Sequence, residues 1–389
     1  MIVGMMMDVK YLSYFVALML FGVLCVPLNA SAQFFEEEKL KAVPHFTDFS
    51  TEEFKAKTEL IEDEPYSDSS LAFSVRLPEG WSKIEGVGKG AVPGETKVSI
   101  LREVARYSGP ATPYPPSFFS LELLDMEYDI TANIWFLNYI LENAFNLQGM
   151  KLNEDGSVEG LYVRVIDDRS YVVRCKVQIN GSRMTMASYG VPDTRWNDER
   201  TFQDKAIEFF EFYDPLAPQG EKKITYNFLD MVRFEYPASW RQVTTQTASA
   251  DSAYLRFMPP TAKNKRDLSQ GLIEVQILST EISRSLEKEV AAVQKDMIDS
   301  GWRIKRLLSD VTDDYNVHDT IEFHRVDIYE AENQSAYGGS KANEIWFAVL
   351  ADRDFLYFVK MIAPRREVSF LDWARNKEVF KTIVETIRP

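Results

Sequence analysis

The hydrophobic and polar positions of the chain repeat in the same order twice after residue 70. Leu77-Pro78-Glu79-Gly80-Trp81 ends one run with the alternation of a strand, and Tyr236-Pro237-Ala238-Ser239-Trp240 ends another 159 positions later. A further strand is expected after each, over 120–126 and over 272–280. The repetition predicts a duplicated domain.

Each expected strand is followed by a segment with helical spacing that ends in glycine. The helix of the second copy is expected to begin at the N-cap Ser283 and to stop at Gly301. Its counterpart lies 152 positions earlier and is expected to stop at Gly149. The apolar positions that define the two helices are Leu286, Val290, Val293 and Met297 in the second copy, and Ile134, Leu141 and Phe145 in the first.

Both copies then continue with a hairpin and a last helix. Residues 173–179 alternate up to Asn180-Gly181, which is a type I′ turn signal, and residues 345–351 alternate up to Asp352-Arg353. The last helices are expected around 209–213 and 383–387. The fold class is therefore α+β, with two tandem layered domains, each an antiparallel sheet covered by helices in an α/β/α sandwich.

This order divides the chain into five parts: a signal peptide over 1–32, an acidic N-terminal arm over 33–70, a first domain over 71–215, a linker over 216–223 and a second domain over 224–389. Changes in the offset between the copies predict two insertions. We expect them at the proline-rich loop 109–116 in the first copy and at 330–341 in the second. Such loops can carry separate functions, although they also drift at little cost.

The first 32 residues have the pattern of a secretory signal peptide. An uncharged apolar run over 11–28 follows Lys10 and precedes Ala30-Ser31-Ala32, so we expect cleavage after Ala32 and a periplasmic or secreted protein. An uncleaved membrane anchor and lipidation at Cys25 are the alternatives. After cleavage Cys175 is the only cysteine, which leaves the mature protein without an internal disulfide.

The arm over 33–70 holds much of the negative charge. It contains 11 acids and 4 bases, a balance of −7 within the −15 of the whole chain. We expect a mobile or loosely docked arm with a short helix around 51–60. Its five Phe residues would either pack on the first domain or bind a partner. The acidic balance of the chain disfavours nucleic acid and anionic membrane surfaces, which need basic side chains.

The two copies resemble the PsbP-like superfamily, on the residues Val75-Arg76-Leu77-Pro78-Glu79-Gly80-Trp81 and Phe234-Glu235-Tyr236-Pro237-Ala238-Ser239-Trp240 and on the order of elements. That group includes the photosystem II PsbP subunit, a Ran-binding nuclear import factor and envelope lipoproteins of the DcrB type. The resemblance implies one domain over 71–215 and another over 224–389. It also implies action by binding other proteins, and it supplies no catalytic motif.

The patterns that suggest catalysis are weak. Ser285-Leu286-Glu287-Lys288 fits the Ser-x-x-Lys pattern of serine acyl enzymes, but neither Ser-Asp-Asn nor Lys-Thr-Gly follows it. Gly86-Val87-Gly88-Lys89-Gly90 matches no nucleotide-binding fingerprint. Cys175 falls on the apolar side of its strand, where a thiol is inert.

The patterns that suggest metal binding are equally incomplete. His318, Glu322 and His324 could share a neighbourhood, but a zinc site needs a further ligand. Acids around Asp310 and around Asp155 invite a calcium hypothesis, but neither set fits the twelve-residue EF-hand loop, so we interpret them as turn formers. We predict no cofactor and no metal.

The helix of the first copy is apolar almost all round. Trp135, Phe136, Tyr139 and Ile140 add to its core positions, so something must cover them. The second domain, the Phe-rich arm and a partner protein are the candidates, and we take these four residues as the candidate interaction surface.

The function expected from the sequence is a non-catalytic binding or assembly module that acts through protein-protein contacts in the cell envelope. The partner would be an envelope protein, with no nucleic acid and no membrane span after signal cleavage. A small-ligand or lipid carrier with an apolar pocket between sheet and helix is the alternative. A hydrolase that uses Ser285 or His324 is a third hypothesis.

Overall fold

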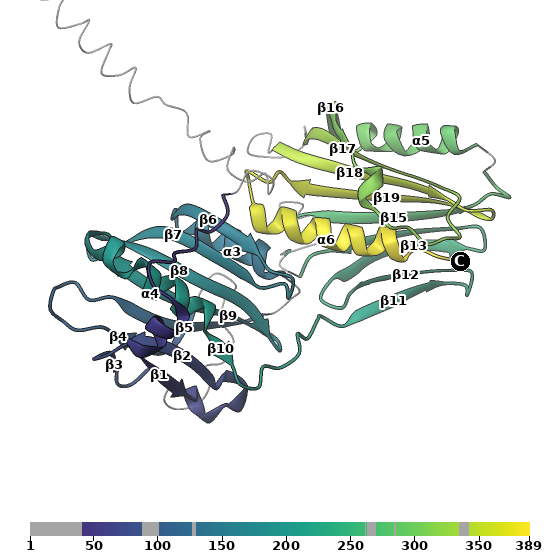
Figure 1. Ribbon diagram of the computed structural model, residues 1–389. Helices are drawn as coiled ribbons and strands as arrows, with labels where there is room; N and C mark the ends of the chain where they lie inside the picture. The colour runs from purple at the N-terminus through teal and green to yellow at the C-terminus, as the bar shows by residue number, and fades with distance from the viewer. Residues whose placement is uncertain are drawn as a thin grey trace, which may run out of the picture. The chain divides into compact units, whose positions relative to one another are not determined.

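The computed structural model describes residues 41–87, 101–126, 130–260, 262, 270–283, 285–333 and 342–389. Val43 to Pro389 form one compact unit, shown in Figure 1. The predicted signal peptide and its cleavage site lie outside the described residues.

The first half is built on a seven-stranded antiparallel sheet. Its strands are β3 (Ser82–Lys83), β4 (Arg102–Ser108), β5 (Phe118–Asp125), β6 (Asn146–Leu152), β7 (Val158–Ile166), β8 (Arg169–Asn180) and β9 (Arg183–Pro192). They lie in the order β3-β4-β5-β9-β8-β7-β6, so the return strand β9 pairs with β5 in the middle of the sheet.

The second half is built on a sheet with the same order. Its strands are β13 (Arg241–Ser249), β14 (Ser252–Met258), β15 (Leu272–Ser279), β16 (Trp302–Asp310), β17 (Phe323–Asn333), β18 (Ala342–Ala351) and β19 (Phe355–Pro364). The order β13-β14-β15-β19-β18-β17-β16 repeats that of the first sheet strand for strand. The prediction of two sheet-dominated halves with antiparallel hairpins is therefore confirmed.

Helices and two small sheets complete the halves. The α-helices are α2 (Thr51–Ala56), α3 (Ala132–Glu142), α4 (Trp196–Glu208), α5 (Leu286–Asp299) and α6 (Phe370–Thr386), and the short 3-10 helices are η3 (Pro65–Ser67), η4 (Ser69–Leu71), η5 (Asp193–Arg195) and η6 (Thr312–Asp314). One small sheet joins β1 (Thr58–Asp63), β2 (Phe73–Pro78) and β10 (Glu211–Phe212), and the other joins β11 (Lys223–Phe228) and β12 (Val232–Pro237).

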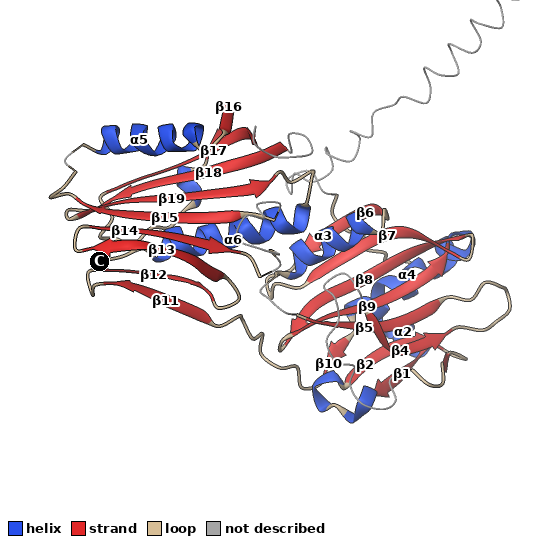
Figure 2. Ribbon diagram, turned by 180° about the vertical axis from the view of Figure 1, so that it is seen from behind, coloured by secondary structure: helices blue, strands red, loops and turns tan. Residues whose placement is uncertain are grey.

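Alternation along the strands gives the second large sheet a separate core on each face. Ile273 and Val275 of β15 pack in the core that includes α6, whereas Leu272 packs in the core that includes α5 (Figure 2). Phe234 of β12 also packs in the α6 core, so a small sheet shares this cover with the helix. The predicted cover by helices alone is incomplete, because β-strand residues supply part of it.

The segment 43–70 is not a loosely docked arm. Helix α2 begins at the N-cap Ser50 and ends at Ala56, and the chain then turns into β1, which pairs along its whole length with β2. Phe54 of α2 is fully buried in the core of the first half. The helix was predicted correctly at its start, but its second half is strand, because the alternating residues 58–63 extend the sheet that β2 begins.

The helix of the first copy ends earlier than the offset predicted. Helix α3 stops at Glu142, and Gly149 lies inside β6. Ala144 takes the positive φ of 52° that Gly301, at 89°, supplies after α5. An alanine therefore takes the positive-φ position after the helix at which the sequence comparison expected a glycine. For this reason the end of the helix could not be predicted from the glycine pattern.

The two predicted insertions also differ from the structure. The proline-rich connection between β4 and β5 spans 109–117, and its counterpart between β14 and β15 is longer, at 259–271. The extra length of the first copy lies instead between β3 and β4, of which 88–100 are outside the described residues. In the second copy the connection 311–322 is longer than its counterpart 153–157, and most of the predicted insertion 330–341 lies outside the described residues.

The linker between the halves is bonded at both ends. The Leu216 N–H donates to Asn180 Oδ1 at 2.8 Å, and the Gln219 N–H donates to the Gly181 carbonyl at 2.9 Å. Beyond Gly220, the Glu221 carboxylate accepts from the Ser239 N–H. The linker is therefore fixed to the first half up to Gln219 and to the second half from Glu221.

Candidate functional site

The four residues taken as an interaction surface are buried. Trp135, Phe136, Tyr139 and Ile140 are 1%, 0%, 8% and 3% exposed. Helix α3 contacts β6, β7 and β8 of its own sheet and α6 of the second half. These side chains are therefore buried within the chain and do not form an exposed surface; Phe136 and Tyr139 pack on their own sheet, which was not among the three predicted covers.

The space between α3 and its sheet is filled by aromatic rings. Phe136 lies directly over Gly160 of β7, which has no side chain to displace it. Tyr139 packs edge to face on Phe145 with ring centroids 5.5 Å apart, and Phe145 stacks on Tyr162 at 5.3 Å. These rings occupy the region in which the carrier hypothesis expected an apolar pocket.

An exposed aromatic side chain lies instead on the proline-rich β4–β5 connection. Tyr114 is 68% exposed, and the preceding residues 110–113 are also exposed. The guanidinium of Arg169, the first residue of β8, lies 5.3 Å from the centre of the Tyr114 ring. We define residues 110–114 together with Arg169 as the Tyr114 surface.

The connection that carries Tyr114 is held at both ends. The Gly109 N–H donates to the Ser117 carbonyl at 2.9 Å, and the Tyr171 hydroxyl donates to the Pro116 carbonyl at 3.3 Å. A Cβ at Gly109 would lie 3.2 Å from the Trp81 ring, so the glycine lets this ring pack against the backbone. The loop is therefore fixed where it leaves the sheet and where it returns.

Arg195 holds the tip of the same loop. Its guanidinium donates to the Pro113 carbonyl at 3.2 Å and to Ser117 Oγ at 2.6 Å, and it pairs with Glu199 of α4 at 2.9 Å. Ser117 Oγ in turn donates to Glu199 at 2.6 Å. Tyr114 is thus presented to solvent from a supported backbone, so little conformational freedom remains to be lost on binding.

A second polar site lies where the segment 43–50 joins the first half. The guanidinium of Arg174 is fully buried and pairs with Asp204 of α4 at 2.7 Å and with Glu159 of β7 at 2.5 Å. It also donates to the Pro44 carbonyl at 2.8 Å. The Phe46 N–H donates to Asp204 at 2.5 Å, so the same ion network fixes the incoming chain.

This network has ligand types that suit a metal, but its centre is occupied. His45, Glu159 and Asp204 place one possible ligand atom each within 4.8 Å of one another, and they are the group with this property among the described residues. The Arg174 guanidinium contacts both carboxylates and lies 3.4 Å from His45 Nδ1. A guanidinium already supplies the positive charge, so the arrangement suits a structural ion network rather than a metal ion.

The predicted serine and histidine sites do not assemble. Ser285 is the N-cap of α5, and its Oγ accepts from the Lys288 N–H at 3.3 Å. His318 is exposed and bonds Thr320, whereas His324 lies in β17. A helix cap explains the Ser-x-x-Lys spacing, because the two residues meet through a backbone N–H and not through their side chains.

The acids and the thiol take the structural roles expected of them. Asp155 accepts from the Ser157 N–H at 2.9 Å, and Asp310 accepts from the Thr312 N–H at 3.0 Å, as turn-forming acids do. Cys175 is fully buried, and burial raises the pKa of its thiol well above the ordinary value. Both interpretations are confirmed.

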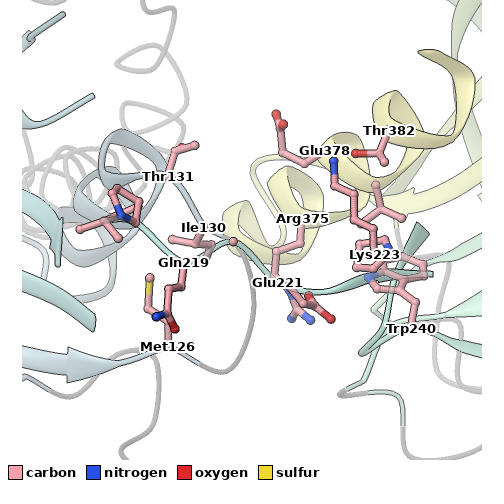
Figure 3. Close-up of a pocket in the computed structure, with 15 residues that line it drawn as sticks. Met126, Ile130, Thr131, Gln219, Glu221, Lys223, Trp240, Arg375, Glu378 and Thr382 are labelled. Atoms are coloured by element: carbon pink, nitrogen blue, oxygen red, sulfur yellow. The ribbon is translucent and has the colours of Figure 1, made fainter. Parts of the chain in front are cut away.

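A cavity of about 320 Å³ lies beside the linker, shown in Figure 3. Met126 and Ile130 line one side, and Arg375 of α6 and Trp240 line the other. The lining is mostly apolar, and the Arg375 side chain is 5% exposed. Glu221, Lys223 and Glu378 also line it, and Arg375 pairs with Asp372 at 3.7 Å, so the site combines apolar walls with charged groups of both signs.

Sequence reasoning missed the Tyr114 surface and the Arg174 network. Tyr114 was part of a recognised loop, but Arg169 and Arg195, which support it, come from distant segments. Arg174 and Asp204 are separated from Pro44 by more than a hundred residues, and only the folded chain brings them together.

No protein-family model matches the chain, and the search of curated proteins found no match. Among solved structures it is similar to the cyanobacterial PsbP of Synechocystis sp. PCC 6803, with 16% identity over 41% of this chain and 94% of that one and a TM-score of 0.29. The Ran-binding protein Mog1p of Saccharomyces cerevisiae matches with 9% identity over 43% of this chain and 96% of that one, also at 0.29.

A third similar structure covers more of the chain. The type VI secretion immunity protein TplEi of Pseudomonas aeruginosa matches with 12% identity over 81% of this chain and 94% of that one, at a TM-score of 0.21. These likenesses do not assign the chain to a family. The described residues contain no helix long and apolar enough to cross a membrane.

Proposed function

We propose that the protein is a non-catalytic binding module that acts through protein-protein contacts in the cell envelope, built from tandem PsbP-like α/β/α domains. The repeated strand order and the two Trp-terminated sequence elements support the tandem arrangement. The single observation that carries the binding role is the exposed Tyr114 on its supported loop.

The Tyr114 surface has the chemistry of a protein-binding hot spot. Tyr and Arg are enriched at the energetic centres of protein interfaces, where a rigid aromatic side chain buries a large area at little entropic cost. Tyr114 and Arg169 place these two residue types together, with the exposed Pro113 beside them. A complementary partner would offer an apolar pocket for the ring and a carboxylate for the guanidinium.

Site-specific photo-crosslinking tests this role. A benzoylphenylalanine at position 114 should give a discrete crosslinked product in the cells that make the protein, and the same probe at Leu229, which is 56% exposed, should not. The protein found in the crosslinked product should no longer co-purify with Tyr114→Ala. The midpoint of thermal unfolding of this variant should equal that of the wild type. Equal products at both positions, or an unchanged partner with Tyr114→Ala, would refute the binding role.

The envelope location is supported by the apolar run over 11–28 and by the small residues that follow it. Sequencing the N-terminus of the protein purified from its own cells tests it. A mature chain that begins at Gln33 supports export and cleavage. A retained N-terminal segment in a cytoplasmic fraction would contradict the proposal.

A small-ligand or lipid carrier is the second candidate, and the cavity beside the linker favours it. This cavity would take a small molecule whose apolar part lies on Ile130 and Trp240. Native mass spectrometry of the freshly purified protein separates the candidates. A carrier should retain a bound small molecule that is lost on Val379→Trp, whereas a protein-binding module should show the bare mass.

A further inference from the structure

Glu122 and Glu274 occupy the same position in the two large sheets. Glu122 lies on β5 and Glu274 on β15, the third strand of each order, at the 152-residue offset. Across the central pair of strands, Glu122 lies opposite Met186 of β9, whereas Glu274 lies opposite Lys360 of β19. The duplication thus provides an internal comparison of one carboxyl position in two settings, with Glu274 buried and Glu122 half-buried with its Oε2 atom covered.

Glu274 is fully compensated. It is 7% exposed, and one carboxylate oxygen lies 2.9 Å from the Arg256 guanidinium of β14. The other oxygen pairs with the Lys360 ammonium group. Two cations on the two neighbouring strands therefore stabilise the ionised form of this carboxyl.

Glu122 has lost both of these cations. The residue opposite it on β4 is Glu103, whose carboxylate pairs with Arg106 at 2.6 Å. The residue opposite it on β9 is the uncharged Met186. Its buried Oε2 has no hydrogen-bond partner among the residues that the structure describes. A carboxyl in this setting is costly to ionise.

The charged and titratable groups around Glu122 do not replace the missing cations. Burial raises the pKa of the Glu122 carboxyl to about 7, against the opposing effect of Arg164 and with a further increase from Glu103. The groups that face it from the packed elements are Glu103 and Arg106 of β4, Tyr139 of α3, Tyr162 and Arg164 of β7, and Cys175 of β8.

We propose that Glu122 is a proton-binding site through which pH controls the packing of α3 on the first large sheet. The protonated carboxyl tolerates a buried Oε2 that lacks a hydrogen bond, and the ionised carboxyl favours an opened, hydrated arrangement. Tyr139 couples the two elements, because it belongs to α3 and its hydroxyl senses Glu122: burial, and after it the Glu122 charge, raise the pKa of this hydroxyl to about 12.

The direction of the effect follows from comparing the pKa of the Glu122 carboxyl in the folded chain with its ordinary value. The pKa of Glu122 is raised from the ordinary 4.5 to about 7 in the folded chain, so the folded state binds the proton more tightly. The packed state is therefore favoured fully below pH 4.5 and loses this advantage as the pH rises to 7 and above. The duplicated site in the second half, with its cations in place, should not respond in this range.

Hydrogen exchange of the α3 amides at pH 5 and pH 8, corrected for intrinsic exchange rates, tests the proposal on the full chain. Protection of α3 should fall about 10- to 100-fold at the higher pH in the wild-type protein. Glu122→Gln should remove the difference, because the amide stays neutral. Met186→Lys should reduce it as well, by supplying the cation that Lys360 supplies to Glu274.

Glu274→Gln is the matched control. It removes the acceptor of Arg256 and Lys360 and should lower protection in the second half at both pH values, while α3 keeps its response. Equal protection of α3 at pH 5 and pH 8 in the wild-type protein would overturn the proposal, and so would a response that persists in Glu122→Gln. If Met186→Lys does not fold, the Glu122→Gln comparison alone decides.

Discussion

The ring of Phe136 on α3 occupies the space over Gly160 that a side chain would fill. A Cβ at Gly160 would lie 2.2 Å from Phe136 Cζ, far inside van der Waals contact. The helix therefore approaches the sheet as closely as it does because β7 carries a glycine at this one place.

Gly160→Ala should consequently destabilise the first half. The fully buried Phe136 ring has to move away from the added methyl group, which we expect to cost about 1–3 kcal/mol in the free energy of unfolding. Urea unfolding measures the change. Val165→Ala, on the same strand but 66% exposed, should stay within about 0.5 kcal/mol of the wild type, and a similar loss in both variants would contradict this account.

Replacing Arg174 with Met should release the segment 43–50. The change leaves the Glu159 and Asp204 carboxylates without the buried guanidinium, which typically costs about 3–5 kcal/mol. Limited chymotrypsin digestion should then cut faster after Phe46. Arg200→Met removes the exposed pair with Asp48 and the contact of the guanidinium with the Phe46 ring, 4.8 Å from its centre, and should cost about 1–2 kcal/mol; cleavage as fast as in Arg174→Met would argue against the network as the anchor.

Ser285→Ala should weaken helix α5 through the loss of its N-cap. The Ser285 Oγ bond to the Lys288 N–H satisfies a helix donor, and the substitution should cost about 0.5–2 kcal/mol. Lys288→Ala keeps the backbone donor, so thermal unfolding should show a clearly smaller change. A larger loss of stability in Lys288→Ala than in Ser285→Ala would mean that the lysine side chain has a role that the helix cap does not explain.

Asp68 should contribute an acid-sensitive part of the stability. Burial acts to raise the pKa of this carboxyl, but hydrogen bonds from Ser70 and Arg183 outweigh burial and hold it below the ordinary 3.8. The stabilisation is therefore complete above the unfolded pKa and is lost as the pH falls through the lower, folded one. In Asp68→Asn the free energy of unfolding should fall less steeply as the pH drops below about 4. An unchanged slope would mean that other carboxyls cause the acid sensitivity.

The local patterns predicted several elements of the fold but not their neighbours. The last helix of the first copy, expected around 209–213, is wrong, because α4 ends at Glu208 and the strand β10 follows it.

The predicted hairpin between β8 and β9 is present, but its turn lies one residue later than predicted. Asn180 is still strand and pairs with Arg183, so the loop residues are Gly181 and Ser182, of which only Gly181 has a positive φ, at 64°, whereas the predicted type I′ turn needs two. The end of α3 was missed because Ala144 adopts a positive φ without being a glycine. Conformations that tertiary packing imposes leave no such mark in the sequence.

The candidate surface could not be located from the sequence for a related reason. A helix that is apolar all round predicts that something covers it, and Tyr139 looks the same in the sequence whether Phe145 and Tyr162 of its own half or another protein does so. Tyr114 carries no periodic signal, since its exposure depends on Arg195 and Ser117, which hold its loop from other elements. Such support is a property of three-dimensional contacts.

The bonded linker has a consequence for how such a chain could have originated. Its anchors to the first half end at Gln219 and those to the second half resume at Glu221, so Gly220 is the one residue between them. A fusion of two separate genes would need hardly more than this one residue of unanchored linker. Two polypeptides divided at Gly220 would each keep all seven strands of a large sheet.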